Sequence, residues 1–357
     1  MSARVERLRE LLLAQELAAV VVAGGANLRY LTGFTGSSGA AVVTAGGEAR
    51  FLTDFRYEEQ SQHEVDAAFA RAIVSGDLLK ALAGDLPPGR VGFEEATTTV
   101  AELARLEQDA AGEVELVSAG KLVEQLRAVK DDEEIERIAA AALLVDEIYA
   151  WLLARGLGGR RERDVAVELE HEMRLRGASG PSFDSIVASG AHAALPHAQP
   201  RDVAIESGCL VTIDIGALLD GYCSDCTRTF AVGEPGPQAR EIYQLVLAAQ
   251  IDGLDALTPG RNGREVDAVS RQVIDEAGYG EQFGHGLGHG VGLEIHEPPR
   301  LSPHAPEDPL VSGNVVTVEP GIYLPGVLGV RIEDLAVLTG DGARRLSQFT
   351  KELLVVD

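Results

Sequence analysis

The sequence predicts an α/β (α+β) protein built from two domains. Its 357 residues exceed the usual size of one domain. Roughly the first 120 residues alternate strand-like apolar runs with helical patterns, which is typical of a small α/β domain. A long helical pattern begins near residue 130, and two acidic hairpins follow it. We therefore expect domains of residues 1–123 and 124–357.

The elements of the first domain follow from local periodicity. Residues 3–15 predict an amphipathic helix, and the apolar run 17–24 predicts a buried strand. A Gly/Ser-rich loop and a second strand are expected within residues 30–44, and a third strand within residues 48–57. Residues 65–86 mix helix and strand signals.

The second domain opens on a long helix and contains a faint repeat. The helix is expected within residues 130–159, which start with acidic residues and end in glycine, as helix termini prefer. Residues 162–177 resemble residues 265–278, since both carry Glu-x-Asp at the start of a helix that stops at glycine. Two βαβ-like halves are consistent with this match.

Composition excludes several classes of partner. The formal net charge of −25 repels nucleic acid and anionic membranes, so neither is expected to bind. No secretion signal or membrane-length apolar run is visible. The three cysteines, Cys209, Cys223 and Cys226, indicate reduced thiols and a cytoplasmic protein. The C-x-x-C pair is not expected to form a joint site, since residues three apart on a strand face opposite ways.

Each strand of a predicted hairpin over residues 209–232 carries one aspartate, Asp214 in the first and Asp225 in the second. A turn on Leu219–Asp220 would place Asp214 opposite Asp225. A turn on Asp220–Gly221, a strong hairpin signal, would make the same two residues diagonal neighbours. In either register both carboxylates share one face of the hairpin.

Opposed like charges destabilise a hairpin, so this pair needs an explanation. A solvated face is one interpretation. The surrounding strand positions instead predict a largely buried sheet: Val211, Ile213, Ile215, Thr227, Thr229 and Phe230. Two buried carboxylates need a cation or a shared proton, and we favour a metal.

A second hairpin, residues 314–338, repeats this arrangement around a turn at Pro325–Gly326. Glu319 ends its first strand and Glu333 sits in its second, and a loop of odd length would place them opposite each other. Arg331 falls on the same face as Glu333. A surface Arg–Glu pair is the alternative, but it does not account for two acidic hairpins together.

Three histidines lie on a glycine-rich stretch, residues 283–299, that would make a poor helix. His289 stands between two glycines, with His285 four residues before it and His296 seven residues after it. Glycine lets the backbone approach a ligand closely, which favours a binding role for His289. A nucleotide-binding loop competes, but no G-K-[ST] motif or acidic ribose partner accompanies it. Four other histidines are expected to be structural: His63, His171, His192 and His304.

Two aspartates, two glutamates and one histidine form an oxygen-rich donor set. Such a set suits two hard or borderline divalent ions, Mn²⁺ first, with Co²⁺, Zn²⁺ and Fe²⁺ as alternatives. A single Mg²⁺ does not require this many carboxylates. Paired ions roughly 3.5–4 Å apart share one hydroxide and polarise a carbonyl, which indicates a hydrolase.

These residues resemble the pita-bread metallopeptidases, and within them the Xaa-Pro branch of prolidase and aminopeptidase P. The shared motifs are DIG (Asp214), DCTRT (Asp225), GHGVGLEIHEPP (His289, His296), VEPGIY (Glu319) and RIED (Arg331, Glu333). YLTGFTGSSG and TDFRY resemble the creatinase-type N-terminal domain, so the likeness covers the whole chain. It implies a creatinase-like N-terminal domain followed by a pita-bread catalytic domain.

The resemblance assigns a role to each residue of the predicted site. It implies five metal ligands: Asp214, Asp225, His289, Glu319 and Glu333. Asp225 and Glu333 would bridge both ions, and Glu319 would also act as the general base. His197, in LPHAQP, takes the place of a substrate-site histidine, and His296 would bind the substrate carbonyl and stabilise the oxyanion. His285 would line the proline pocket, and Arg331 would support the ligands and the substrate.

The implied reaction is hydrolysis of the Xaa-Pro bond, at the N-terminus of peptides with proline second, by metal-bridged hydroxide attack. We hypothesise a prolidase that prefers dipeptides, with aminopeptidase P as the alternative. A prolidase must cap the proline carboxylate, and Arg50 or Arg56 are candidates. A homodimer is expected from the resemblance.

Three other readings of the family stay open. A creatinase-like amidinohydrolase should lack most of the acidic ligands. A methionine aminopeptidase would not normally carry this N-terminal domain. An inactive pita-bread binding module should lose Glu319 or His289.

Overall fold

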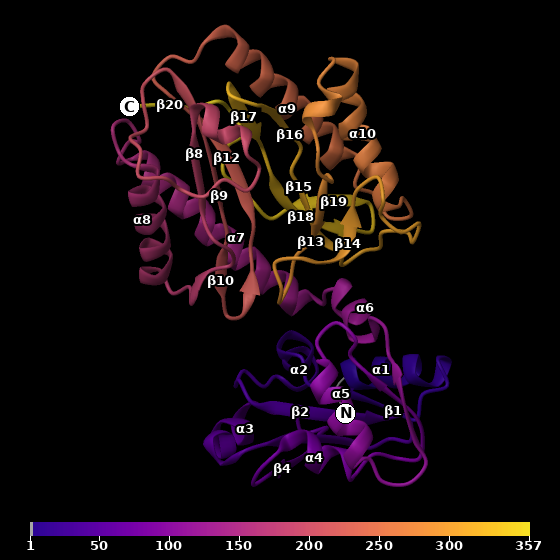
Figure 1. Ribbon diagram of the computed structural model, residues 1–357. Helices are drawn as coiled ribbons and strands as arrows, with labels where there is room; N and C mark the ends of the chain where they lie inside the picture. Colours follow the sequence, from indigo (N-terminus) through magenta and orange to yellow (C-terminus); the bar gives the residue numbers. More distant parts are fainter. Residues whose placement is uncertain (1–2) are drawn as a thin grey trace. The chain divides into compact units, whose positions relative to one another are not determined.

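The computed structural model describes residues 3–357 and divides into two units, one ending at Arg127 and the other starting at Ala128 (Figure 1). The first two residues of the predicted N-terminal domain lie outside the described residues. Helix α6 (Leu122–Ala128) contains both this division and the boundary that we predicted between residues 123 and 124. We retain that boundary as a proposal.

The N-terminal unit is built on a six-stranded mixed sheet in the order β4-β3-β2-β1-β5-β6. Its strands are β1 (Ala19–Val22), β2 (Gly39–Thr44), β3 (Ala49–Thr53), β4 (Ala70–Ile73), β5 (Gly89–Phe93) and β6 (Val114–Ser118). Its helices are α1 (Ala3–Ala14), α2 (Gly25–Thr32), α3 (Glu58–Glu64), α4 (Leu78–Ala83) and α5 (Val100–Asp109), with a 3₁₀ turn η1 (Phe55–Tyr57). The predicted first helix and first three strands are present. Helix α2 was missed, and it ends at Gly33, whose left-handed φ of 81° suits glycine at a helix end.

The C-terminal unit begins with α7 (Asp132–Leu153), the long helix that the sequence predicts. Asp131 caps it by accepting from the N–H of Glu134, whose carboxylate accepts in return. The first half continues with α8 (Glu162–Leu175), β7 (Gly180–Pro181), β8 (Ile186–Ser189), η2 (Gly190–Ala194), β9 (Cys209–Ile215), β10 (Ala217–Leu219), β11 (Tyr222–Cys223) and β12 (Cys226–Val232). One sheet has the order β20-β12-β9-β8, and a smaller one β11-β10-β7.

The second half repeats this plan of two helices, a short strand and a hairpin. Its elements are α9 (Pro237–Asp255), α10 (Gly263–Glu276), η3 (Gly280–Gln282), β13 (Gly288–Gly290), β14 (Glu297–Leu301), β15 (Val315–Val318), β16 (Gly321–Leu324), β17 (Leu328–Arg331), β18 (Asp334–Thr339), β19 (Gly342–Arg345) and β20 (Val355–Val356). The sheet order is β14-β13-β15-β18-β19, with β16 and β17 paired separately.

The predicted repeat is real in outline, but its details differ. Helices α8 and α10 each have 14 residues, follow Arg161 and Asn262, and stop before glycines of positive φ, Gly177 (100°) and Gly278 (85°). The Glu-x-Asp match was misaligned by two residues, because its glutamates are the first residue of α8 and the third residue of α10. The βαβ-like halves were wrong, since β8–β9 and β13–β15 pair antiparallel.

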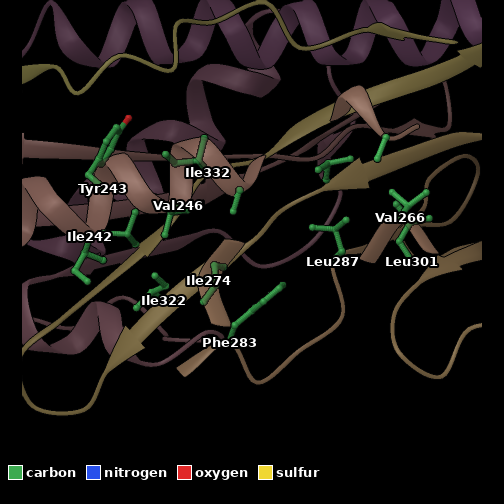
Figure 2. Close-up of a cluster of buried hydrophobic side chains, with 14 of the residues drawn as sticks. Ile242, Tyr243, Val246, Val266, Ile274, Phe283, Leu287, Leu301, Ile322 and Ile332 are labelled. Carbon is green, nitrogen blue, oxygen red and sulfur yellow. The ribbon is translucent and has the colours of Figure 1, made fainter. Parts of the chain in front are cut away.

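Each half of the C-terminal unit has its own large cluster of buried apolar side chains. In the second half, α9 and α10 contribute Ile242, Tyr243, Val246, Val266 and Ile274 to the cluster that Figure 2 draws. In the first half, α7 and α8 pack against β9 and β12. None of the helices in the described part of the chain is long and apolar enough to cross a membrane.

Candidate active site

The first acidic pair lies on the hairpin of β9 and β12. Its turn occupies Asp220 and Gly221, with φ of 49° and 80°, the left-handed pair that suits a tight two-residue turn. Of the two predicted registers this turn selects the diagonal one, and Asp214 lies opposite Thr227. Asp214 and Asp225 still share one face and are only 8% and 5% exposed, which excludes a solvated acidic face.

The second acidic pair lies on the longer hairpin formed by β15 to β18. Leu324 pairs with Leu328, which leaves a three-residue loop of the predicted odd length. The same register continues between β15 and β18, so Glu319 and Glu333 face each other across the hairpin. Glu333 lies between β17 and β18 rather than within a strand, because its N–H donates to the carbonyl of Thr227 on the first hairpin (3.1 Å).

The two hairpins and β13 bring the five predicted metal ligands together. Single carboxylate oxygens of Asp214, Asp225 and Glu333 lie within 4.8 Å of one another. Nε2 of His289 lies 3.5 Å from Oδ2 of Asp225 and 3.3 Å from Oε1 of Glu319. Segments far apart in the sequence therefore converge on one point.

Close strand packing explains the glycines beside His289. A Cβ on Gly288 would collide with the carbonyl of Thr317, and a Cβ on Gly290 would collide with the carbonyl of Pro298. These glycines therefore give clearance between neighbouring strands, not clearance for a ligand as the sequence suggested. Nδ1 of His289 donates to the carbonyl of Gly290 (3.0 Å), which leaves Nε2 as the lone-pair nitrogen beside the carboxylates.

The cluster opens into a cavity of about 900 Å³ whose lining residues all belong to the C-terminal unit. Glu333 is the one predicted ligand that does not line it, and this residue is 1% exposed. The other predicted site residues also line the cavity: His197, His285, His296 and Arg331. The lining also includes apolar side chains: Ala166, Val167, Phe183, Ile186 and Ile295. The arrangement thus combines a buried acidic centre, several imidazoles and apolar side chains.

Comparison with known proteins places this arrangement in a family. Residues 136–340 match Metallopeptidase family M24, and residues 4–129 match the Creatinase/Prolidase N-terminal domain. The chain belongs to metallopeptidase family M24. It is 44% identical to the uncharacterised peptidase YqhT of Bacillus subtilis, over 99% of this chain and 100% of that protein.

Two solved peptidase structures are similar to this chain over nearly its whole length. The Xaa-Pro dipeptidase from Bacillus anthracis superposes with a TM-score of 0.95 at 40% identity, over 99% of each chain. The X-Pro aminopeptidase from Thermotoga maritima superposes with a TM-score of 0.90 at 36% identity, over 99% of this chain and 100% of that one. The sequence predicted a creatinase-like N-terminal domain that is followed along the chain by a pita-bread catalytic domain, and this prediction is confirmed.

The buried centre fits the divalent ions that an M24 metallopeptidase uses. Oδ1 of Asp214, Oδ1 of Asp225 and Oε1 of Glu333 are buried and have no hydrogen-bond partner in the part of the chain that the structure describes. Such orphaned oxygens are costly without a cation. Burial and then the neighbouring carboxylates raise the pKa of Asp225 and Glu333 well above their usual values. Burial lowers the pKa of His289 to about 3, so its imidazole is neutral, the form that binds metal.

Arg331 joins the acidic centre to the cavity wall. Arg331 as a whole is only 4% exposed. Its guanidinium donates to Oδ2 of Asp214 (2.7 Å) and to the hydroxyl of Thr227 (3.0 Å). It also donates to the carbonyl of Pro196 and to the hydroxyl of Tyr323. The alternative of a surface Arg–Glu pair is excluded, because Arg331 is buried and its carboxylate partner is Asp214.

Tyr323 is a site residue that the sequence did not reveal. Nδ1 of His285 donates to the carbonyl of Gly286 (2.8 Å), so Nε2 accepts from the Tyr323 hydroxyl (2.9 Å). That hydroxyl in turn accepts from Arg331 (2.9 Å). Burial lowers the pKa of His285 to about 4, which keeps its ring neutral. His285 is thereby fixed in orientation on the cavity wall.

Two threonines that orient carboxylates were also missed. Thr227 donates to Oε2 of Glu333 (2.8 Å), and Thr317 donates to Oε1 of Glu319 (3.0 Å). Thr227 lies two residues after Asp225, and Thr317 lies two residues before Glu319. Each threonine is therefore on the same strand face as that predicted ligand. This period of two was the available signal.

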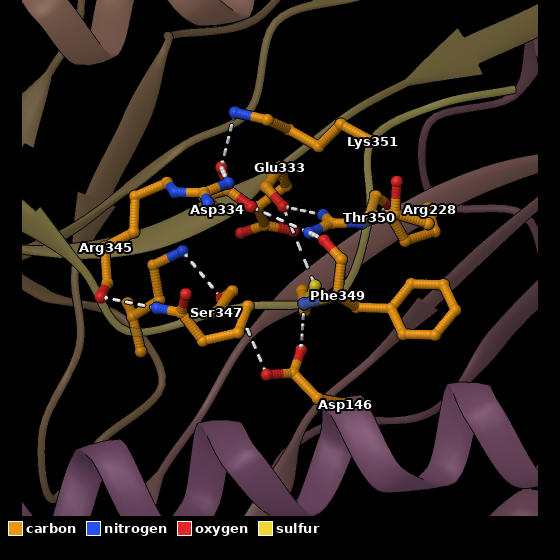
Figure 3. A network of polar contacts seen from close by, with 12 residues as sticks. Asp146, Arg228, Glu333, Asp334, Arg345, Ser347, Phe349, Thr350 and Lys351 are labelled. Carbon is orange, nitrogen blue, oxygen red and sulfur yellow. Dashed lines mark hydrogen bonds and ion pairs between the residues drawn. The ribbon is translucent and has the colours of Figure 1, made fainter.

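A buried ionic network holds the backbone of Glu333 in place (Figure 3). The guanidinium of Arg228 donates to Oδ1 of Asp334 (2.8 Å), to the carbonyl of Phe349 (2.7 Å) and to the carbonyl of Glu333. Lys351 donates to the other oxygen of Asp334 (2.7 Å). The backbone at Glu333 is therefore anchored to the C-terminal segment.

The structure points to a different arginine for the cavity than the sequence did. Arg50 is paired with Asp85, and Arg56 is paired with Asp54 (2.8 Å). Arg300, four residues after His296, lines the cavity. Sequence reasoning passed over this arginine, although it directly follows the HEPP segment.

Proposed function

We propose that this chain is a dinuclear metal-dependent peptidase that hydrolyses the Xaa-Pro bond at the N-terminus of peptides with proline in second position. The observation that carries the proposal is the convergence of four carboxylates and the lone-pair nitrogen of His289 on one buried point. Relatives named Xaa-Pro dipeptidase and X-Pro aminopeptidase, matched over nearly the whole chain, support the substrate class.

The five residues would hold two ions, with Asp225 and Glu333 shared between them. We propose Mn²⁺ as the resident ion, ahead of Co²⁺, Zn²⁺ or Fe²⁺, because the donor set is mostly carboxylate oxygen. Bound ions would supply a nucleophile from water at neutral pH and polarise the scissile carbonyl. Metal analysis of the purified protein, followed by assay after chelation and after reloading, tests this assignment.

The chain's own residues would handle the proton and the carbonyl. Glu319 lines the cavity beside His289, and its carboxylate would accept a proton from the attacking water and pass it to the proline nitrogen. His296 and His197 line the cavity and would hydrogen-bond the substrate carbonyl as negative charge develops on its oxygen. His285 and Arg331 would shape the pocket for the proline ring, which carries no N–H to recognise.

We propose a preference for dipeptides. Arg300 lines the cavity and is the candidate for binding a free proline carboxylate, whereas Arg50 and Arg56 are already paired with carboxylates. The competing aminopeptidase reading is supported by the likeness to the Thermotoga maritima X-Pro aminopeptidase. Comparing Ala-Pro with Ala-Pro-Ala decides between them, and faster cleavage of the tripeptide would sink the dipeptidase proposal.

Substitution of the cavity arginine sharpens this test. Arg300→Met should raise KM for Ala-Pro at least tenfold and affect Ala-Pro-Ala much less, because one charge-assisted contact is worth about 1.5–3 kcal/mol. Arg240→Met is the matched control, since Arg240 pairs with Glu234 outside the cavity. An equal loss on both substrates would show that Arg300 does not read the free carboxylate.

Two further features of the protein are proposals. A cytoplasmic location is supported by the small, odd number of cysteines in a large chain: Cys209, Cys223 and Cys226. A homodimer is proposed from the family alone, and light scattering of the purified protein tests it. A metal-free amidinohydrolase or an inactive binding module is less well supported, because the chain keeps all five acidic and histidine positions of the candidate centre.

A further inference from the structure

One buried carboxylate fastens both ends of the loop that carries His197. Glu162, the first residue of α8, is fully buried. It accepts from the N–H (2.8 Å) and hydroxyl (2.7 Å) of Ser189 at the start of the loop. It also accepts from the N–H (3.0 Å) and two guanidinium nitrogens (3.0 and 3.1 Å) of Arg201 at the far end. Residues 190–200 are thus closed into a ring at a single side chain.

The loop contacts the rest of the domain at several points, and its residues 196–200 line the cavity. Nδ1 of His192 lies 3.2 Å from Oε2 of Glu162. In the middle of the loop, the carbonyl of Ala193 lies so close to Gly329 that a Cβ there would collide with it. Next to His197, the carbonyl of Pro196 accepts from Arg331. Movement of either loop end would therefore change how His197 is presented to the cavity.

The second half of the domain shows what Glu162 replaces. Helices α8 and α10 are equivalent, and Glu162, which follows Arg161, corresponds to Gly263, which follows Asn262. At Gly263 the returning chain packs directly on the helix start, and a Cβ would collide with the carbonyl of Arg300. In the first half, the side chain of Glu162 stands at this position between the helix start and the returning chain. Its carboxylate oxygens are engaged by the loop, since they accept the hydrogen bonds from Ser189 and Arg201.

We propose that Glu162 is a positioning residue, which fastens the ends of the loop 189–201 and so fixes His197 in the cavity. The inference rests on the proposed function only where it assigns His197 to the substrate. The fastening itself is a property of the loop and can be measured without turnover. Loss of the carboxylate charge should free residues 190–200 and lower activity through His197.

The test compares Glu162→Gln with Asp164→Asn. Asp164 lies in the same first turn of α8 but is exposed, so the control removes an equal charge near the helix N-terminus without touching the loop. Hydrogen exchange of the metal-loaded enzyme should speed up at least tenfold within residues 190–200 in Glu162→Gln and stay unchanged in the control. Unchanged loop protection in Glu162→Gln would overturn the proposal.

A double-mutant cycle with His197→Ala tests the route of the effect. Glu162→Gln alone should lower kcat/KM for Ala-Pro at least tenfold, yet less than twofold further in the His197→Ala background. Multiplying effects would indicate a general structural role and overturn the positioning claim. If His197→Ala leaves turnover unchanged, the role of His197 in the proposed function fails, while the exchange measurement still decides the fastening. If Glu162→Gln does not fold, Arg201→Met is the second variant. It removes the guanidinium bonds to Glu162 at one end of the loop, and the Arg201 side chain that it changes is 44% exposed.

Discussion

Removing the charge of Asp334 should destabilise the C-terminal unit by several kcal/mol. Asp334 is fully buried and accepts from Arg228 (2.8 Å), Lys351 (2.7 Å), Gln250 (3.2 Å) and Arg345 (3.4 Å). Asp334→Asn keeps the shape but leaves Arg228, which is 1% exposed, without its anion.

The surroundings of Arg228 set the size of the effect. Breaking a buried ion pair costs about 3–5 kcal/mol when the remaining charge is uncompensated. Arg228 would still donate to the carbonyls of Phe349 and Thr350, so we expect the lower end, about 3 kcal/mol. Arg345→Gln is the matched control, because Arg345 is 39% exposed and lies 3.4 Å from Asp334, and it should cost less than about 1 kcal/mol.

Urea unfolding of the chelated protein measures the difference. The single tryptophan, Trp151, lies in α7 and reports on the C-terminal unit alone. Burial would raise the pKa of Asp334, but the charges of Arg228 and Lys351 outweigh it and hold the pKa below 3.8. A depressed folded-state pKa contributes stability above the unfolded value, which is lost as the pH falls through the folded one. The gap between parent and Asp334→Asn should thus persist from about pH 7 to 5 and shrink below about pH 4. A loss under about 1 kcal/mol at pH 7 would refute this reasoning.

Three further outcomes are expected. His289→Ala should abolish hydrolysis and weaken metal binding, measured by metal analysis, while exposed His304→Ala should not; full metal content and turnover in His289→Ala would contradict the ligand assignment. Metal binding at pH 7 should release protons, because the pKa of Glu319 is raised to about 7 and the pKa values of Asp225 and Glu333 are raised too. Titration calorimetry in buffers of different ionisation enthalpy measures this release. An apparent binding enthalpy that does not depend on the buffer would contradict it. Tyr323→Phe should cost about 1–3 kcal/mol of stability or transition-state binding, because it removes the hydroxyl between His285 and Arg331; unchanged urea midpoint and KM together would count against that link.

The shared face of each acidic pair could be predicted because strand periodicity is local. Either turn at Asp220 leaves Asp214 and Asp225 on one side of the hairpin, so the error in choosing a register had no effect on the site. The odd loop that opposes Glu319 and Glu333 followed from the same arithmetic. Long-range contacts follow no such period. That is why Tyr323, which meets His285 across the cavity wall, and Arg300 were missed.

The sequence by itself determined the chemistry of this protein: which residues can bind metal, which of them share a strand face, and which family motifs they form. Only the tertiary structure decided that the hairpins meet through the bond from Glu333 to Thr227, and that the glycines beside His289 serve strand packing. It also decided that Glu162 closes the His197 loop. The physical reason is that side-chain alternation is a property of each strand alone. The partners of a buried carboxylate depend instead on which distant segments pack against it.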